Sequence, residues 1–392
     1  MHYSSIDIFC TVIDNFGDIG VAYRFARELK RSLPTCRIRM FVDDLHTLSA
    51  IEPAIQPAQP FQSHNTISII DTTRLTPGFL STLNPADVLV EAFACHIPES
   101  IMAIAVLRPC LIINLDHLSA EPWVAGYHLK ESMLPIANIK KYFFMPGFTE
   151  NTGGVIIDHR LQRIKPWLKR HRKWCLEKIM TVAGHHISDP EKSQIGSVFT
   201  YTRGFDNLLN DLESGSKPTI LLVFGRKSHV GMIHTIERLP HHRVTDSVFK
   251  TGRTTILLMP FVPQRVYDVL LCLCDFNIVR GEDSLVRAIM AGRPFIWNAY
   301  LQEKQYQLVK VRAFADLFET YCTNPAVFAN YHRLLLEFNS ATDESSAQVT
   351  PEHYHAFFDN SVEIEHATGE MCYFLARRGD LVKQFIDFLA TL

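Results

Sequence analysis

Several features that assign a chain to a class at a glance are missing from this 392-residue sequence. No apolar run reaches the roughly 18–20 residues that a membrane-spanning helix needs, so we expect no membrane partner. The chain opens directly on a strand-like pattern, which argues against a signal peptide. A formal net charge of −2 gives no reason to expect direct binding of nucleic acid. These absences favour a cytoplasmic protein.

Signatures of metal, cofactor and disulfide chemistry are missing as well. The nine cysteines are odd in number and contain no CxxC pair, which is typical of reduced thiols in a cytoplasmic protein. The 18 histidines include no HExxH spacing, so we expect no metal. Neither a Walker A motif nor GxGxxG occurs, which argues against an ATPase or a nicotinamide enzyme. We therefore expect no cofactor.

What is present is an ordinary globular composition, with 47% hydrophobic and 20% charged residues. The length favours two domains of about 150–200 residues each. We expect one domain to comprise 1–157 with a C-terminal helix at 366–392, and the other to comprise 158–365.

The stretch on which the rest of the chain is organised reads SIDIFCTVIDNFGDIGVAYRFARELK, at residues 5–30. Ser5–Ile13 is an apolar, β-branched run that predicts a buried strand. An apolar residue then recurs every four positions, as in one face of a helix. A strand, a glycine-containing turn and a helix open a βαβ unit, and ligands of open α/β sheets bind over such turns.

Two carboxylates, Asp14 and Asp18, are the unusual feature of that turn, because a plain phosphate-binding turn would avoid negative charge. They suit a general base or a cradle for a cationic substrate. The alternative is that Asp18 caps the helix and Asp14 forms an Asx turn. For either residue alone, that structural role is the more frequent one.

Strands and helices alternate through the first half. The pattern predicts strands at 37–42, 66–70, 87–92 and 109–114, with a crossover helix at 98–106, and hence a mostly parallel sheet covered on both faces. Glu91 and Asp116 fall at strand ends, where capping is their expected role. The irregular segment 117–154, with a short strand at 142–145, is predicted to border a cleft.

A second alternating domain follows the strongly basic run RIKPWLKRHRK at 163–173. We interpret that run as the solvated face of a linker helix, with a docking patch for an acidic macromolecule as the alternative. Strands are predicted at 196–200, 219–224, 254–261, 276–279 and 294–297. Helices are predicted at 205–212, 232–239, 266–274 and 284–291, and the chain is predicted to be helical after Gln302.

The richest motif of the second domain is Val279-Arg280-Gly281-Glu282-Asp283-Ser284, between a strand and a helix start. Asp283 and Ser284 are good cap residues, but capping does not require Arg280. A guanidinium beside a helix N-terminus predicts a diphosphate site. Glu282 is suited to accept a hydrogen bond from a sugar hydroxyl.

Aromatic residues at two other strand ends extend this site. Core packing is the default role for Phe199. Tyr201 and Phe261 are candidates to stack on a base, and Gln264 is a candidate to bind the edge of a pyrimidine. Taken together, the residues predict two doubly wound, Rossmann-like α/β domains facing across a cleft, as in a sugar-nucleotide glycosyltransferase of the GT-B type.

The sequence resembles the bacterial elongation factor P arginine rhamnosyltransferases (EarP) over essentially its whole length. The resemblance is carried by DIFCTVIDNFGDIGVAYRFARELK at 7–30, NLDHLSAEPWV at 114–124, FFMPGFTENTGG at 143–154, MPFVPQ at 259–264 and RGEDSLVRAIMAGRPFIW at 280–297. It implies inverting, metal-independent transfer of rhamnose from dTDP-β-L-rhamnose to one arginine of elongation factor P. The resemblance also implies that the modified elongation factor P rescues ribosomes stalled at polyproline.

The same resemblance assigns roles to individual residues. It implies that Asp18 is the general base, and that Asp14 and Glu282 are essential as well. It implies substrate-binding positions at Asn15, Phe16, Gly17, Phe199, Tyr201, Phe261, Gln264, Arg280, Gly281, Asp283 and Ser284.

As the docking partner, the resemblance implies the amino-terminal domain of elongation factor P. Two other functions stay open from the residues alone. They are a GT-B enzyme with another nucleotide sugar and a small-molecule acceptor, and a non-catalytic module that binds a sugar nucleotide.

Overall fold

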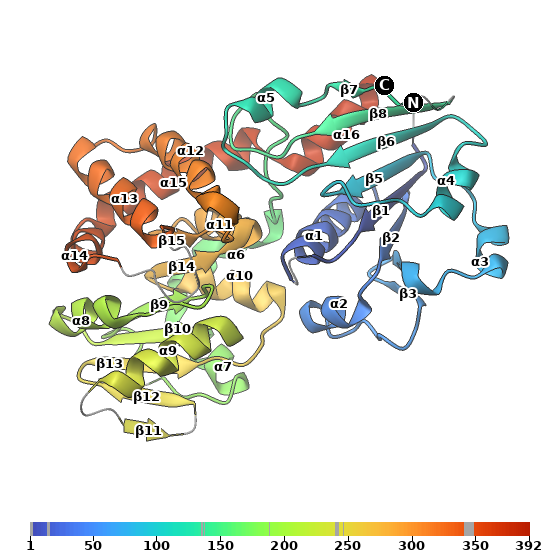
Figure 1. The fold of residues 1–392 in the computed structure, drawn as a ribbon. Helices are drawn as coiled ribbons and strands as arrows, with labels where there is room; N and C mark the ends of the chain where they lie inside the picture. The colour runs from blue at the N-terminus through green and yellow to red at the C-terminus, as the bar shows by residue number, and fades with distance from the viewer. Residues whose placement is uncertain are drawn as a thin grey trace. The chain divides into compact units, whose positions relative to one another are not determined.

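A computed structural model describes residues 3–13, 16–134, 136, 138–187, 189–239, 243–245, 247–340 and 349–392 (Figure 1). Its contacts divide the chain into two compact units. Unit 1 is Met1–Asp158 with Leu375–Leu392, and unit 2 is His159–Phe374. The chain thus leaves unit 1 one residue later than the predicted boundary. It returns at Leu375, within the helix Ser361–Arg378, rather than at residue 366.

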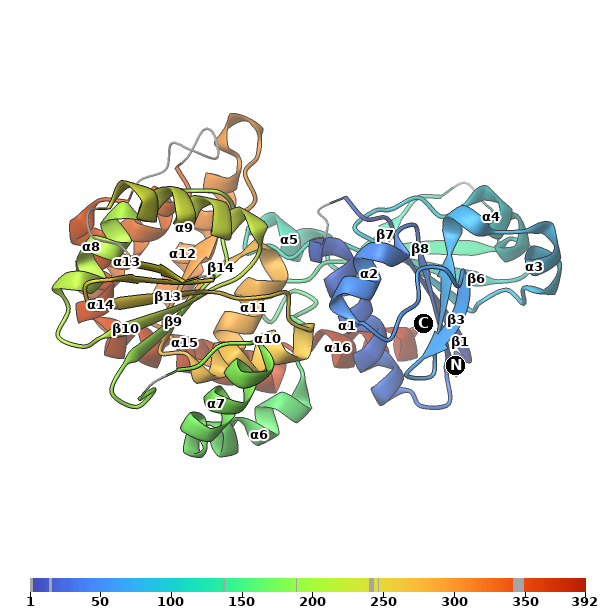
Figure 2. The same cartoon turned by 90° about the horizontal axis from the view of Figure 1, so that it is seen from below.

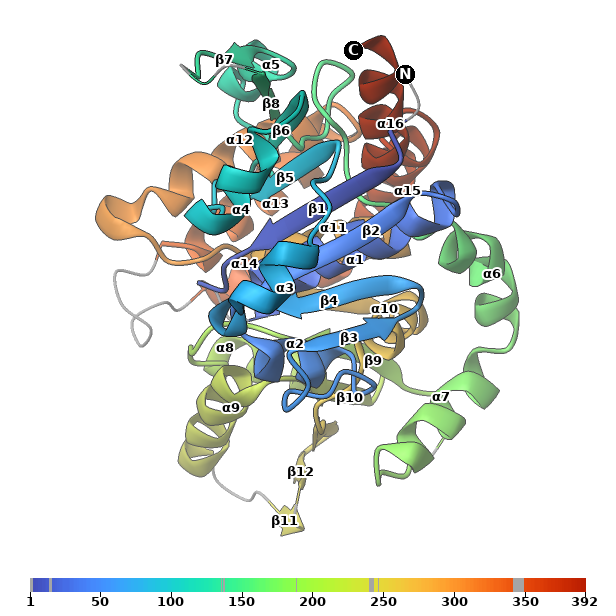
Figure 3. The same cartoon turned by 90° about the vertical axis from the view of Figure 1, so that its right-hand side faces the viewer.

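Unit 1 is built on a sheet whose described strands follow the order β3-β4-β2-β1-β5-β6-β8-β7. The strands are β1 Ser5–Cys10, β2 Arg37–Val42, β3 Phe61–His64, β4 Ile67–Asp71, β5 Val88–Ala92, β6 Cys110–Leu115, β7 Glu131–Ser132 and β8 Ile139–Phe144. All neighbours pair in parallel except the edge pairs β3–β4 and β7–β8. Figure 3 shows β5, β1, β4 and β3 in this order.

Helices cover both faces of this sheet. They are α1 Phe16–Ser32, α2 Leu45–Ile51, α3 Pro77–Thr82, α4 Glu99–Ala105, α5 Trp123–Tyr127 and α16 Leu381–Thr391. On one face, Ile6 and Ile8 of β1 pack in a core with Phe25 of α1 and Phe385 of α16. On the other face, Phe9 belongs to a core with α4. Successive residues of a strand point to opposite faces, so a buried strand supplies both cores.

Unit 2 has a second sheet, with the described strands in the order β11-β12-β13-β10-β9-β14-β15. The strands are β9 Gln194–Val198, β10 Thr219–Val223, β11 Arg243–Thr245, β12 Val248–Thr251, β13 Thr254–Leu258, β14 Phe276–Arg280 and β15 Phe295–Asn298. Only β11–β12 and β12–β13 pair antiparallel among them. The predicted α/β class with two doubly wound halves is therefore confirmed.

The helices of unit 2 include the basic run 163–173. They are α6 His159–Arg170, α7 Arg172–Val182, α8 Asp206–Ser214, α9 Arg226–Arg238, α10 Gln264–Leu273, α11 Gly281–Ala291, α12 Gln307–Glu319, α13 Pro325–Phe338, α14 Pro351–Asp359 and α15 Ser361–Arg378. Figure 2 shows α6 and α7 below α10. Arg172 donates to the carbonyl oxygen of Leu273 (2.7 Å) and pairs with Asp275, whereas Arg163, Lys169, Arg170 and Lys173 are exposed.

Two predicted strands have different ends, for identifiable reasons. The strand predicted at 254–261 ends at Leu258, because Pro260 has no N–H to donate to a ladder. The strand predicted at 196–200 is β9, which ends at Val198, because the N–H of Thr200 donates to the hydroxyl of Ser228 instead (2.7 Å). The helices α2 and α3 and the β11–β12 hairpin were not predicted at all.

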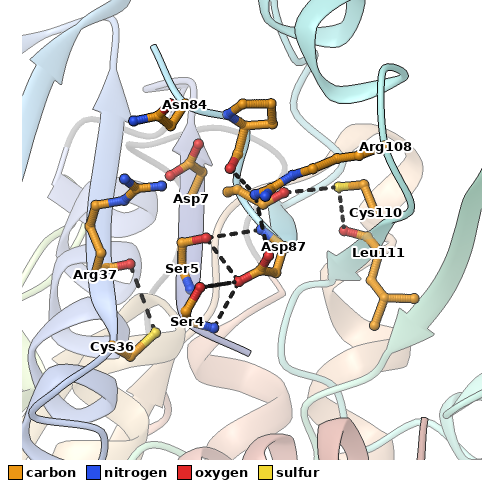
Figure 4. A network of polar contacts seen from close by, with 12 residues as sticks. Ser4, Ser5, Asp7, Cys36, Arg37, Asn84, Asp87, Arg108, Cys110 and Leu111 are labelled. Carbon is orange, nitrogen blue, oxygen red and sulfur yellow. Dashed lines mark hydrogen bonds and ion pairs between the residues drawn. The ribbon is translucent and has the colours of Figure 1, made fainter. Parts of the chain in front are cut away.

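The amino-terminal edge of the unit 1 sheet is held by a local network (Figure 4). One carboxylate oxygen of Asp87 accepts hydrogen bonds from the backbone N–H groups and hydroxyls of Ser4 and Ser5, at 2.7–3.0 Å. These contacts join the start of β5 to the start of β1. They lie at the opposite end of the strands from the turn that follows β1, so the carboxyl edge is left for a ligand.

Candidate active site

One candidate site, in unit 1, is the turn between β1 and α1. Asp18 lies in the first turn of α1, where a carboxylate is favoured by the helix dipole. One of its oxygens accepts the N–H of Ile13 at 3.0 Å, and only 7% of the residue is exposed. This contact holds the carboxylate against the carboxyl end of β1.

The neighbours of Asp18 in this turn are placed as follows. Phe16 is the first residue of α1 and is exposed, and Gly17 is half-buried. The predicted site residues Asp14 and Asn15 lie outside the described residues. From the end of β2, a carboxylate oxygen of Asp43 accepts the N–H of Val12 at 3.0 Å. Two aspartates, Asp18 and Asp43, therefore hold consecutive backbone amides of the same segment.

Capping was expected of Glu91 and Asp116, and the structure gives only Asp116 a local backbone contact of that kind. Glu91 of β5 forms an ion pair with Lys141 of β8. The carboxylate of Asp116 accepts the N–H of the adjacent His117 at 2.7 Å.

A second candidate site, in unit 2, lies at the carboxyl edge of its sheet and centres on Arg280, the last residue of β14. Its guanidinium carbon lies 4.2 Å from the ring centroid of Phe199 and 5.0 Å from that of Tyr201. It also donates to the carbonyl oxygen of Thr200 at 3.1 Å. Because β9 and β14 are adjacent and parallel, their ends bring the cation and both rings together. Cation–π contacts of this kind orient a guanidinium without neutralising it.

The rings themselves are held from the neighbouring strands. The N–H of Tyr201 donates to the amide oxygen of Asn298 at 3.0 Å, and the ring of Tyr300 meets the Tyr201 ring edge-on at 5.6 Å. Gly225 follows β10 with a φ of +79°, and a Cβ there would lie 2.7 Å from the Phe199 ring. Glycine is thus required both by the backbone angle and by the space that Phe199 occupies.

The helix α11 begins at the predicted motif. Gly281 has a φ of +68°, and its carbonyl oxygen accepts from the indole N–H of Trp297 at 3.0 Å. Arg280 is the N-cap, and its side chain makes no capping hydrogen bond to the described backbone. The start of a helix is suited to an anion, because its first N–H groups point away from the helix.

The acidic residues of this motif have basic and amide partners. Glu282 lies 3.5 Å from the ammonium of Lys310, and Asp283 lies 3.4 Å from the guanidinium of Arg287. The amide of Gln264 donates to Asp283 at 3.3 Å. Ser284 is buried in the first turn.

These contacts tie Asp283 to Gln264 and Arg287, so at least part of its role is to fix the helix start. Phe261, in the segment between β13 and α10, is well exposed.

Further residues near the unit 2 site were missed by the sequence analysis. The ammonium of Lys227, at the start of α9, lies 5.4 Å from the Tyr201 ring centroid. Tyr267 of α10 meets the rings of Phe199 and Phe224 edge-on, at 5.7 and 5.3 Å, and burial raises its pKa. In the sequence, the only feature that could have singled out Lys227 and Tyr267 is their position in the first turn of a helix that follows a strand.

Among the residues that the structure describes, no helix is both long and apolar enough to cross a membrane.

Comparison with known proteins places the chain in a family. Residues 6–390 match the family model for the Elongation-Factor P (EF-P) rhamnosyltransferase EarP. A protein-arginine rhamnosyltransferase of Shewanella oneidensis is 36% identical over 335 residues, which are 82% of this chain and 81% of that protein. One of Pseudomonas aeruginosa is 34% identical over 323 residues, 80% of this chain and 82% of that protein.

A solved structure has the same fold over almost the whole chain. It was described as the structural basis for EarP-mediated arginine glycosylation of translation elongation factor EF-P. It aligns with a TM-score of 0.64 and 23% identity over 99% of both chains. The chain thus belongs to the EF-P rhamnosyltransferase EarP family of glycosyltransferases.

Proposed function

We propose that this protein transfers rhamnose from dTDP-β-L-rhamnose to one arginine side chain of EF-P, with inversion and without a metal or other cofactor. Family membership supports the reaction. The structural observation that carries the proposal is the Arg280 guanidinium, held over Phe199 and Tyr201 at the start of α11.

On the donor side, unit 2 is suited to a nucleotide diphosphate. Arg280 and the first N–H groups of α11 would receive the diphosphate, since both stabilise anionic oxygens. Tyr201 and Phe261 are the proposed stacking partners of the base, and Gln264 the partner of its edge. Glu282 is the proposed partner of a sugar hydroxyl.

On the acceptor side, unit 1 supplies carboxylates. A guanidinium is a poor nucleophile because its lone pairs are delocalised and its pKa exceeds about 12. Asp14 and Asp18 would hold the planar group by hydrogen bonds and localise its charge, and Asp18 would accept the proton that is released on attack. Asn15, Phe16 and Gly17 are assigned to the same turn.

The proposed reaction is a single displacement at the anomeric carbon of rhamnose. A nitrogen of the arginine forms a bond to the anomeric carbon of rhamnose, while the bond from that carbon to the diphosphate oxygen breaks. The diphosphate leaves with the electron pair, and Asp18 takes the proton. Attack opposite the leaving group inverts the anomeric centre. Arg280 and the α11 start would stabilise the charge on the departing dTDP.

The proposed acceptor is the folded amino-terminal domain of EF-P rather than a short peptide. A peptide loses about 1–2 kcal/mol of conformational free energy per backbone residue that is fixed on binding, whereas a folded domain has already lost it. The isolated domain should therefore have a much higher kcat/KM than a linear peptide around the same arginine. Equal values would contradict recognition of the folded domain.

The decisive test is intact-mass analysis of purified EF-P after incubation with this protein and dTDP-β-L-rhamnose. The expected result is a gain of one rhamnosyl group, absent when the acceptor arginine is replaced by lysine. Transfer to small molecules without modification of EF-P would favour another glycosyltransferase activity. Donor binding without any turnover would favour a binding module.

A cytoplasmic reaction belongs to the same proposal, since all nine cysteines are free and most are buried.

A further inference from the structure

The basic run at 163–173 and the residues around it form an exposed surface of unit 2 that the proposed reaction does not use. Between residues 159 and 182 the chain has eight lysines and arginines and one carboxylate, Glu177. The same segment holds Trp167 and Trp174, which are 47% and 55% exposed. Cations alone indicate a solvated helix face, whereas exposed tryptophans among them indicate an interaction surface. The net charge of −2, from which no nucleic acid was expected, conceals this local positive charge.

The helices α6 and α7 are nearly continuous, so residues from both share one face. The N–H of His171 donates to the carbonyl oxygen of Trp167, and the N–H of Cys175 donates to that of His171, each at 3.0 Å. These are the bonds between residues four apart that define an α-helix. Side chains three or four residues apart lie on one stripe of a helix. The residues spaced in this way, which we call the α6–α7 ridge, are Arg163, Trp167, His171, Trp174 and Lys178.

Contacts between the rings give the ridge a defined shape. The ring of His171 stacks on that of Trp167 with the centroids 4.5 Å apart, and Trp174 meets Trp167 edge-on at 6.0 Å. Because the rings hold one another, little side-chain entropy remains to be lost when a ligand covers them.

The opposite face of the two helices is already occupied. Leu176 is buried there, and α10 packs against both α6 and α7 (Figure 2). Two of the eight cations also have partners within unit 2. Lys165 donates to the carbonyl oxygen of Met290 at 2.9 Å, and Arg172 pairs with Asp275. The ridge is thus the side that is left for a partner.

The cations of the ridge are not neutralised within the protein. In the described part of the chain, neither Arg163 nor Lys178 pairs with a carboxylate, and the same holds for the exposed Lys169, Arg170 and Lys173 beside the ridge. Like charges that are three or four residues apart on a helix repel one another. An anionic ligand would remove that repulsion.

Three classes of anionic partner differ in what they would use on this surface. A helix that lies on a membrane has its aromatic and basic residues on separate faces, whereas here they share one stripe. An acidic polypeptide would pair with the cations and leave the rings unused. A single strand of nucleic acid supplies phosphates for the cations and bases that stack on exposed rings. The combination on the ridge matches this last class.

We propose that the α6–α7 ridge binds single-stranded RNA, with bases stacked on Trp167 and Trp174 and phosphates beside Arg163 and Lys178. From Arg163 to Lys178 the ridge is about 22 Å long at 1.5 Å per residue, the length of about six stacked nucleotides. RNA is the expected strand because most unpaired nucleic acid in a cell is RNA. Its binding here would be independent of rhamnose transfer.

The first test is fluorescence anisotropy of an unstructured, end-labelled RNA of about 16 nucleotides with the full chain. In Trp167→Ala/Trp174→Ala the affinity should fall at least about 30-fold, because two stacked bases are lost. The matched control is Trp123→Ala, since Trp123 of unit 1 is also 47% exposed, and it should leave the RNA affinity unchanged. Wild-type Tm and dTDP affinity in both variants would confirm folding. A ring variant that binds RNA within threefold of wild type would overturn the proposal.

A second test measures the contribution of the charges. The slope of log K for RNA against log salt concentration should fall in magnitude by about 1.4 in Arg163→Gln/Lys178→Gln, since each neutralised phosphate of a single strand contributes about 0.7. The control Lys217→Gln/Lys250→Gln removes two exposed lysines of unit 2 outside the ridge and should keep the wild-type slope. An unchanged slope in the ridge variant would overturn the pairing with phosphates.

Competing ligands decide between the classes of partner. Wild type should bind the single strand at least about tenfold more tightly than an RNA duplex of the same sequence, whose bases are already stacked on one another. Equal affinity for the two would contradict stacking on the tryptophans. Tighter binding of polyglutamate, or of vesicles that contain anionic lipid, would assign the ridge to an acidic protein or a membrane and overturn the proposal. Tighter binding of DNA of the same sequence would exclude RNA as the ligand.

Discussion

The two candidate sites, one in each unit, use the same backbone arrangement and opposite charge. In unit 1, β1 runs through a turn into α1, and Asp18 folds back to accept the N–H of Ile13. In unit 2, β14 runs directly into α11, and Arg280 lies over two aromatic rings.

The parallel strand and the following helix determine only where a ligand can bind. In the proposed reaction, the side chain at the helix start would select the ligand: a cation beside the Asp18 carboxylate, and a diphosphate beside the Arg280 guanidinium.

The largest effect is expected from removing the negative charge of Asp18. Asp18→Asn should lower the rate of arginine rhamnosylation by about 100-fold or more, because a general base typically contributes that much. Its affinity for dTDP, measured by calorimetry, should not change. The matched control is Asp43→Asn, since Asp43 holds the adjacent backbone amide of Val12 but has no proposed chemical role. Turnover by Asp18→Asn within tenfold of wild type would show that Asp18 is not the base.

Removing the positive charge of Arg280 should instead affect binding of the donor. Arg280→Ala should weaken binding of dTDP by about 1.5–3 kcal/mol, the value of a hydrogen bond to a charged group, or about 10- to 150-fold. Arg280→Lys should recover only part of this, because lysine lacks the planar group that stacks on the rings. Calorimetry with Arg238→Ala, an exposed arginine that pairs with Asp206, provides the control. An affinity that is unchanged in Arg280→Ala would remove this residue from the site.

A smaller effect tests whether the rings must stay in place. In Gly225→Ala, the added Cβ would lie 2.7 Å from the Phe199 ring on a backbone with a φ of +79°. The variant should therefore have a lower Tm. It should also bind dTDP about fivefold more weakly, because the cation–π contact of Phe199 would be displaced. Gly184→Ala has the same φ of +79° and nothing within 4 Å of the added carbon. It should cost only backbone strain of about 1–2 kcal/mol and leave dTDP affinity intact. If both variants bind dTDP equally, the position of Phe199 does not matter.

The smallest effect concerns His128, at the end of α5 in unit 1. Burial lowers the pKa of His128 to about 4, against an ordinary value of about 6.5 in the unfolded chain. The neutral ring is therefore favoured by folding. The stability it contributes is present above about pH 6.5 and is lost as the pH falls towards 4. In urea unfolding, wild type should lose more stability between pH 7 and pH 5 than His128→Gln does. Equal losses would exclude His128 as the titrating group.

The sequence by itself determined the local parts of this protein. Apolar periodicity placed β1, α1, β14 and α11, because burial on one face repeats every two or four residues along a short segment. The acidic turn at Asp18 and the Arg280–Ser284 helix start were predicted for the same reason, since turn and cap residues act within a few positions of themselves. The family followed from the motifs, and residues 6–390 match its model.

Only the tertiary structure decided which side chains meet. Arg280 stacks on Phe199 because β14 pairs with β9, and the order of strands in a sheet is not written in any local pattern. Gly225 is constrained by the same Phe199 ring, although the two residues follow different strands. The segment with α5 and β7 was predicted only as part of an irregular loop that borders a cleft. Its shape depends on pairing with β8 and on the His128–Met145 contact, which are formed only when the sheet is complete.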